Sequence, residues 1–179
     1  MTQGSVVVIV ADAGPLFALA VGGVLPQSIA MLGGLRVPQT VLDECMASGD
    51  LTAPGAVTIH TLAQKRAFTV IAHTEIAPLD EAFARGLGSG EAAVLAYAGA
   101  HGHIALIDER RARRIAAKMR VPVIGTGAIV LALKAQRHID SVMPVLLAWK
   151  THGYHLSGAL VAEIIRRARE AQPPTLTDR

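Results

Sequence analysis

Short apolar runs alternate along the chain with longer segments that have helical spacing. Residues 6–10 are five β-branched apolar residues in a row, which is typical of a strand buried on both faces of a sheet. Shorter runs predict further strands at 68–71, 104–107 and 121–124. The first strand, 6–11, ends on Asp12, so a carboxylate follows the most hydrophobic segment of the protein.

The segments between these runs predict helices. Pro15 suits a first helical turn, and Ser89 and Ser157 are expected to be N-caps. Thr126 is expected to cap the helix that follows Gly125. The predicted helices are 15–20, 40–46, 55–66, 91–100, a basic helix after residue 109, 128–136, 142–151 and 158–171.

Strands that are separated by helices predict an α/β fold with a parallel sheet and helices on both faces. We expect a single domain over residues 1–172, with a core at about 6–136, C-terminal helices at 140–171 and a flexible tail at 173–179. In such sheets the functional site lies beyond the carboxyl ends of the strands. Asp12 and Asp108 both follow predicted strands, so both belong to that edge.

Composition narrows the class of protein. The chain is 51% hydrophobic and only 3% aromatic, so the core must consist mainly of aliphatic side chains and alanine. Cys45 is the only cysteine, which excludes an intramolecular disulfide and favours a cytoplasmic protein. No Lys or Arg precedes Arg36, and Asp12 would lie inside any N-terminal membrane span, so neither a signal peptide nor a span is expected.

Positive charge is concentrated in one segment. The net charge of the chain is +3, whereas residues 109–120 contain six cations and one acid. A local basic patch predicts an anionic partner, and a solvated helix face is the alternative. The cations of this segment are Arg110, Arg111, Arg113, Arg114, Lys118 and Arg120.

Four acids stand at junctions between predicted elements: Asp12, Glu44, Glu91 and Asp108. Each has a structural alternative, because Asp and Glu also cap helices, favour the positive end of a helix dipole or lie on the surface. Carboxylates that converge repel one another unless a cation neutralises them. Oxygen ligands of this kind suit Mg²⁺ or Mn²⁺.

Four motifs carry a resemblance to a known family. VADAGPLFALA, VPQTVLDE, LGSGEAAVLAYA and LIDERRARRIAAKMRVPVIGTGAIVLALKAQ resemble, in this order, segments of PIN domains, in the branch of predicted nucleic-acid-binding proteins related to VapC-type toxins. The resemblance implies a three-layer α/β/α sandwich with a central, mainly parallel sheet. It also implies a metal-dependent ribonuclease site built from acidic residues.

Carried over by position, the acids of the family fall on Asp12, Glu44, Glu91 and Asp108, with Glu109 as the competing assignment for the fourth. Many PIN domains have Asp at the third position, and a second Glu often stands where this chain has Ala93.

The resemblance therefore implies a Mg²⁺- or Mn²⁺-dependent endoribonuclease with Asp12, Glu91 and Asp108 as metal ligands and Glu44 assisting. Thr126 is an accessory candidate, because its hydroxyl could reach the scissile phosphate. The RNA backbone would be bound by Arg110, Arg113, Arg114 and Lys118. A toxin role, an antitoxin partner and a homo-oligomer are further expectations.

Two other functions stay open at this point. The first is a PIN-like module that binds nucleic acid or a protein without cutting. The second is a receiver-like phosphoacceptor, but this chain lacks the acidic pair near the first strand and the lysine after a late strand that such domains normally need. His101 and His103 form a lone His-x-His pair, for which a structural role is the expectation. Neither a GxGxxG after the first strand nor a P-loop motif is present, which excludes the common dinucleotide and P-loop sites.

Overall fold

Five short parallel strands form the centre of the fold in the computed structural model, which describes residues 8–47 and 54–170. The strands are β1 Ile9–Ala11, β2 Leu35–Pro38, β3 Thr69–Ile71, β4 Ile104–Leu106 and β5 Val123–Ile124. Strand β2 is not predicted from the apolar pattern, because Arg36 interrupts it. The other four lie within the predicted runs, although residues 6 and 7 are outside the described part of the chain.

The strand order is β3-β2-β1-β4-β5, and every neighbouring pair is parallel. The chain runs outward from β1 to β2 and β3, and then returns to place β4 on the other side of β1. The order therefore reverses between β1 and β4. In open parallel sheets, ligands bind beyond the carboxyl ends of the strands at such a reversal.

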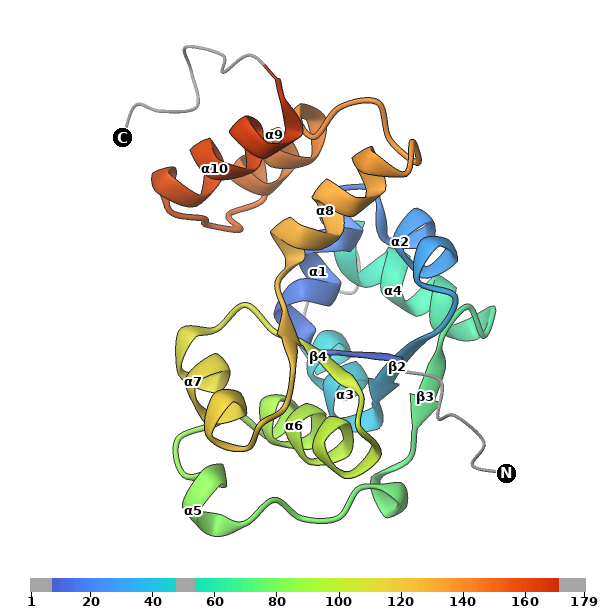
Figure 1. Ribbon diagram of the computed structural model, residues 1–179. Coiled ribbons are helices and arrows are strands. Elements are labelled where there is room, and N and C mark those ends of the chain that lie inside the picture. The colour runs from blue at the N-terminus through green and yellow to red at the C-terminus, as the bar shows by residue number, and fades with distance from the viewer. Residues whose placement is uncertain (1–7, 48–53, 171–179) are drawn as a thin grey trace, which may run out of the picture.

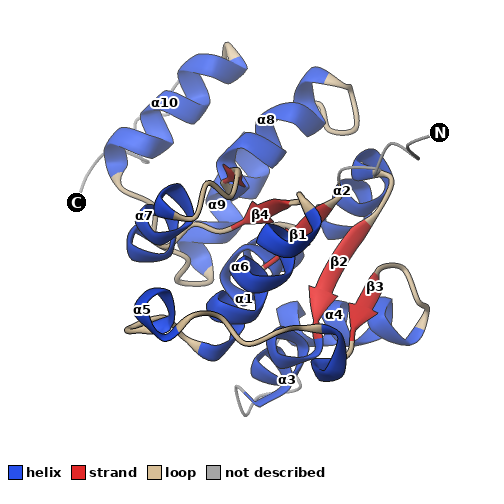
Figure 2. Ribbon diagram, turned by 60° about the horizontal axis from the view of Figure 1, so that its bottom comes forward, coloured by secondary structure: helices blue, strands red, loops and turns tan. Residues whose placement is uncertain are grey.

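Ten α-helices and one short 3₁₀ helix connect and cover the described strands (Figure 2). Helices α2 and α5 and the 3₁₀ helix η1 are not predicted from the sequence; the remaining helices match predicted segments. Their bounds are α1 Ala13–Val21, α2 Leu25–Leu32, α3 Gln39–Ala47, α4 Pro54–Gln64, η1 His73–Glu75, α5 Glu81–Ala84, α6 Ser89–His101, α7 Arg110–Lys118, α8 Thr126–Ala135, α9 Met143–Thr151 and α10 Gly158–Ala168.

The helices lie on both faces of the sheet, which confirms the predicted α/β/α sandwich. Figure 1 shows α6 and α7 on one side of the strands and α1, α2, α4 and α8 on the other. Helix α6 contacts β1, β2 and β4, and α10 packs on α8 farther from the sheet. Fully buried aliphatic residues fill the space between the layers, among them Val10, Leu16, Leu95 and Leu106.

Two of the three predicted helix caps are wrong. Gly88 and Gly125 are the N-cap residues of α6 and α8, and Ser89 and Thr126 are the first residues inside these helices. The hydroxyls of Ser89 and Thr126 donate to carboxylates from other parts of the chain, so they do not cap their own helices. Ser157 does cap α10, accepting a hydrogen bond from the Leu160 amide.

The C-terminal helices α9 and α10 are fixed to the rest of the fold. The indole Nε1 of Trp149, which is 1% exposed, donates to the Ala18 carbonyl of α1 at 2.7 Å. Glu170 accepts hydrogen bonds from Lys134 of α8 and from the Val142 amide before α9. These contacts hold α9 and α10 against α1 and α8. The predicted tail, 173–179, lies outside the described residues.

The apolar N-terminal helices are short and sharply angled to each other. Within the described ranges, no single helix is long and apolar enough to cross a membrane. Helices α1 and α2 have sufficient length and hydropathy only as a pair that is bent by 118°.

Candidate active site

Asp12 is placed by the end of the central strand. Its backbone amide donates to the Leu106 carbonyl of β4 at 3.1 Å, so Asp12 extends the pairing of β1 and β4 by one residue. The residue occupies the N-cap position of α1, but its side chain accepts no capping hydrogen bond there. Asp12 is only 8% exposed. Helix capping therefore does not explain why a buried carboxylate stands at this position.

Burial and three neighbouring carboxylates raise the pKa of Asp12. Desolvation has the largest effect, and a hydrogen bond from the Ala13 backbone partly opposes it. The charges of Glu91, Glu44 and Asp108 raise the pKa further, to about 7 from an ordinary value of 3.8. The structure thus brings the four predicted acids into one electrostatic neighbourhood at the reversal between β1 and β4.

Glu44 is held by the start of α6. Its Oε1 accepts hydrogen bonds from the Ser89 hydroxyl at 2.7 Å and from the Gly90 amide at 2.8 Å. A Cβ on residue 90 would lie 2.5 Å from Glu44 Oε2, which is closer than Cβ atoms approach other atoms. The glycine of the Ser89-Gly90-Glu91 sequence therefore leaves room for the Glu44 carboxylate beside Glu91.

Glu91 has a structural role in this structure. Its Oε2 accepts a hydrogen bond from the Gly88 amide at 2.8 Å, which satisfies a free N–H group at the start of α6. This is the helix-start role that the sequence left open for Glu91. The residue still lies close enough for its charge to raise the pKa of Asp12.

Asp108 is held by two hydroxyls and an amide. Oδ1 accepts a hydrogen bond from the Thr126 amide at 2.9 Å, and Oδ2 accepts from the hydroxyls of Thr126 and Tyr154 in short contacts. Burial, together with the charge of Asp108, raises the pKa of Tyr154 above its ordinary value, so this phenol remains a donor. Tyr154 comes from the loop between α9 and α10.

Glu109, the competing fourth acid, is the N-cap of α7. Its Oε2 accepts a hydrogen bond from the Ala112 amide at 2.7 Å. The acids that raise the pKa of Asp12 include Asp108, and Glu109 is not among them. The geometry therefore groups Asp108 with Asp12, whereas Glu109 stabilises the basic helix.

The donor chemistry of these acids fits a hard divalent cation. All four side chains offer carboxylate oxygens, and a cation would relieve the repulsion that raises the pKa of Asp12. In the part of the chain that the structure describes, no three His, Cys, Asp or Glu side chains converge tightly enough to form a ready metal site. Glu44, Glu91 and Asp108 already accept hydrogen bonds from protein donors, and each carboxylate keeps further lone pairs for a cation.

The basic helix α7 begins directly after these acids. Its cations Arg110, Arg113, Arg114 and Lys118 are all exposed. Arg110 and Arg113 line a cleft of about 710 Å³ next to Asp108, which we call the α7–α10 groove. Lys118 lines a different hollow, beside α5 and α6. Arg113 also donates to the Ile107 carbonyl at 2.9 Å.

The two histidines of the His-x-His pair lie at the other end of the sheet. His103 precedes β4, and its Nε2 lies 3.0 Å from a guanidinium nitrogen of Arg36. The His101 ring stacks on Tyr97 with centroids 4.1 Å apart. These contacts agree with the expected structural role.

Sequence reasoning missed two residues at the site. Tyr154 contacts Asp108 across 46 residues of chain, and no local pattern marks it. Cys45 is fully buried beside Glu44, and burial together with the charges of Asp12 and Glu44 raises the pKa of its thiol to about 12. A thiol with so high a pKa is a poor nucleophile, so Cys45 belongs to the packing around the acids.

Comparison with known proteins identifies one family. A family model described as PIN domain matches residues 8–170, a range that includes every described residue. Searches of curated proteins and of solved structures find no match.

Proposed function

This chain belongs to the PIN domain family, and we propose that it is a Mg²⁺- or Mn²⁺-dependent endoribonuclease. PIN domains have a nuclease-type fold and generally use divalent metal ions. The narrower statements, namely RNA as substrate, the metal and the residues of the site, are our proposal.

One observation carries the proposal: Asp12 and Asp108 follow the two strands between which the strand order reverses. Ligand sites of open parallel sheets form at this point. Glu44 and Glu91 reach the same neighbourhood from α3 and α6, and they raise the pKa of Asp12 together with Asp108. Four acids that destabilise one another in this way favour a bound cation.

In the proposed site, Asp12, Glu91 and Asp108 hold the cation and Glu44 assists them. The cation would supply Lewis acidity, stabilising negative charge on the scissile phosphate and acidifying the attacking water. Thr126 and Tyr154 orient the Asp108 carboxylate by donating to Oδ2. Ser89 and the Gly90 amide orient Glu44 in the same manner.

The basic helix supplies the contacts to the substrate. Arg110, Arg113, Arg114 and Lys118 would bind RNA phosphates, and Arg110 and Arg113 stand nearest to Asp108 because they line the same groove. With few aromatic side chains in the protein, phosphate contacts dominate the proposed binding.

The test is cleavage of a fluorogenic single-stranded RNA with Mg²⁺, with Mn²⁺ and with EDTA. We expect cleavage that needs the metal and that falls at least about 100-fold in Asp12→Asn, because Asn keeps the shape and removes the anionic ligand. Asp140→Asn, at an exposed loop position, is the matched control and should cleave as the wild type does. Metal-independent cleavage, or full activity in Asp12→Asn, would contradict the proposal.

A second candidate is a PIN module that binds RNA without cutting it. The hydrogen bonds that occupy Glu91 and Asp108 favour it, because these acids already have structural partners. Binding of the same RNA with no cleavage at any concentration of either metal would select this candidate.

The toxin role, the antitoxin partner, the cytoplasmic location and the homo-oligomer stay predictions that rest on the resemblance of the motifs and on composition. Growth arrest on expression of the wild type, and normal growth with Asp12→Asn, would support the toxin role.

A further inference from the structure

The α7–α10 groove extends well beyond Asp108, the one acid of the proposed metal site that lines it. It extends from Asp108 along α8 to α10, over about 710 Å³. Its walls come from α7 on one side, from α10 on the other, and from residues 154–157. A volume of this size is in the range of pockets that enclose a ligand.

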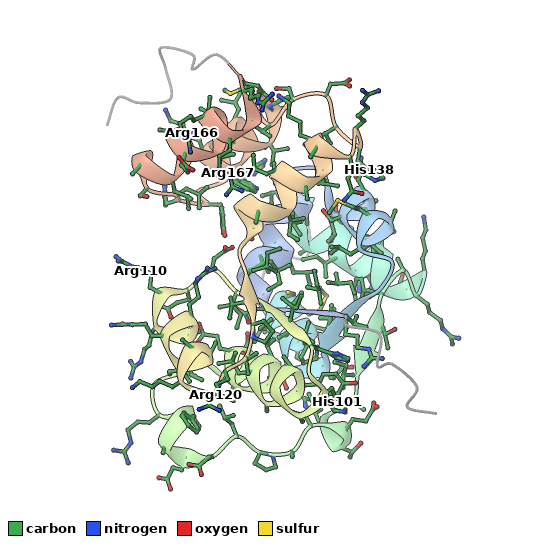
Figure 3. All side chains as sticks on the ribbon, viewed as in Figure 1. His101, Arg110, Arg120, His138, Arg166 and Arg167 are labelled. Carbon is green, nitrogen blue, oxygen red and sulfur yellow. The ribbon has the colours of Figure 1, made fainter. Side chains whose placement is uncertain are left out.

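Cations face the groove from both walls. Arg110 and Arg113 belong to α7, and Arg167 belongs to α10. Figure 3 shows Arg110 at the end of α7 that is nearer to α10, and Arg167 on α10. The guanidinium groups of Arg110 and Arg167 make no hydrogen bond or salt bridge within the described ranges 8–47 and 54–170, although the charge of Arg167 interacts with the Glu163 carboxylate.

The other two acids of the groove are already engaged. Glu109 accepts the hydrogen bond from the Ala112 amide that caps α7. Glu163 forms a two-point ion pair with Arg166, with nitrogen–oxygen distances of 2.7 and 2.9 Å. The groove therefore offers the guanidinium groups of Arg110 and Arg167 to an anion from outside the chain.

The groove also has an apolar wall. Leu160, Ile164 and Arg167 follow one face of α10 at a spacing of four and three residues. Leu160 is a large hydrophobic residue, yet it is 43% exposed. Leu131 of α8 lines the groove as well. The α10 wall thus places two apolar side chains before the cation Arg167.

We propose that the α7–α10 groove binds a single RNA strand on its way to Asp108, with phosphates on Arg110 and Arg167 and an unstacked base against Leu160. The choice of RNA rests on the proposed function. A single strand presents phosphates and free base faces together, whereas a duplex keeps its bases stacked inside and presents mainly its backbone. The C-terminal helix α10 is then part of the substrate site.

The experiment measures fluorescence anisotropy of a labelled single-stranded oligoribonucleotide with the full chain in EDTA, where the proposed cleavage cannot occur. Arg167→Ala should weaken binding about fivefold and lower the slope of log affinity against log salt by about 0.7, the value for one phosphate contact on a single strand. Lys65→Ala is the charge-matched control at the end of α4, and it should bind as the wild type does. Leu160→Ala should weaken binding of the single strand but not of a duplex of the same sequence.

Equal affinity and an equal salt slope in Arg167→Ala and Lys65→Ala would overturn the proposal. A duplex that binds as tightly as the single strand, or polyglutamate of matched charge that competes equally well, would also overturn it, the latter in favour of a protein partner. The two proposals fail separately. If RNA binding depends on Arg167 but no cleavage follows, only the proposed nuclease function is contradicted. If RNA is cleaved and Arg167→Ala has no effect on binding or cleavage, only the proposed role of the groove is contradicted.

Discussion

Replacement of Asp12 by Asn should make the metal-free protein more stable. In the folded wild type the pKa of Asp12 is about 7, against an ordinary value of 3.8, so folding favours the protonated carboxyl group. Each pH unit between these two values costs the folded state about 1.4 kcal/mol. Asn has a similar shape and no charge, and it therefore avoids this cost.

The stability gained by Asp12→Asn should increase as the pH rises. Because the folded pKa is the higher one, the contribution of Asp12 to stability is fully present below about pH 4 and is lost as the pH rises through about 7. In EDTA we expect Asp12→Asn to exceed the wild type by about 2 kcal/mol near pH 5 and by about 4 kcal/mol near pH 8. For a chain of this size, the larger difference raises the melting temperature by about 10 °C.

Urea unfolding and thermal melts, each at both pH values, measure these differences. Asp140→Asn, which removes an exposed carboxylate, should leave the stability unchanged at both. Saturating Mg²⁺ or Mn²⁺ should stabilise the wild type by mass action and should stabilise Asp12→Asn much less. An Asp12→Asn protein that is no more stable than the wild type near pH 8, or a gain that is equal at both pH values, would refute the reasoning.

Three further substitutions test other contacts of the site and the fold. Tyr154→Phe should fold normally but lower kcat for RNA cleavage about tenfold in steady-state assays, because Asp108 loses a donor that orients it. Gly90→Ala should cost about 1 kcal/mol in thermal melts and reduce cleavage, because its Cβ would lie 2.5 Å from Glu44 Oε2. Glu170→Gln should cost about 2 kcal/mol in urea unfolding near pH 7. Burial opposes ionisation of Glu170, but hydrogen bonds hold its pKa below the ordinary 4.5, so this difference should shrink as the pH falls below about 4.5.

Much of the fold follows from local patterns in the sequence. The β-branched run before Asp12 and the run before Asp108 mark β1 and β4, because strands buried on both faces need continuous apolar residues. Strand β2 is not predicted by this pattern because the charged Arg36 lies within it. The guanidinium of Arg36 donates a hydrogen bond to the Tyr97 hydroxyl. The strand order, which places β1 beside β4, depends on contacts between distant segments and cannot be read from any local pattern.

The acids of the site could be named from the sequence, but their partners could not. The family motifs point to Asp12 and Asp108 by position, and the structure adds what surrounds them. Ser89 and Thr126 have the residue types of helix caps, and only the tertiary fold shows that carboxylates from other segments accept their hydroxyl hydrogens. Tyr154 contacts Asp108 because the C-terminal helices α9 and α10 pack on the rest of the fold, and no short-range sequence pattern predicts that packing.

The pairing of β1 with β4 also sets an order of assembly during synthesis. Ile9 of the central strand pairs with Ile104, so β1 leaves the ribosome long before one of its two neighbours exists. A growing chain can form β1, β2 and β3 early, but the edge between Asp12 and Asp108 stays incomplete until the second half has emerged. Tyr154 and Arg167 arrive later still. A nascent chain therefore lacks a finished site until the segment through Arg167 has emerged.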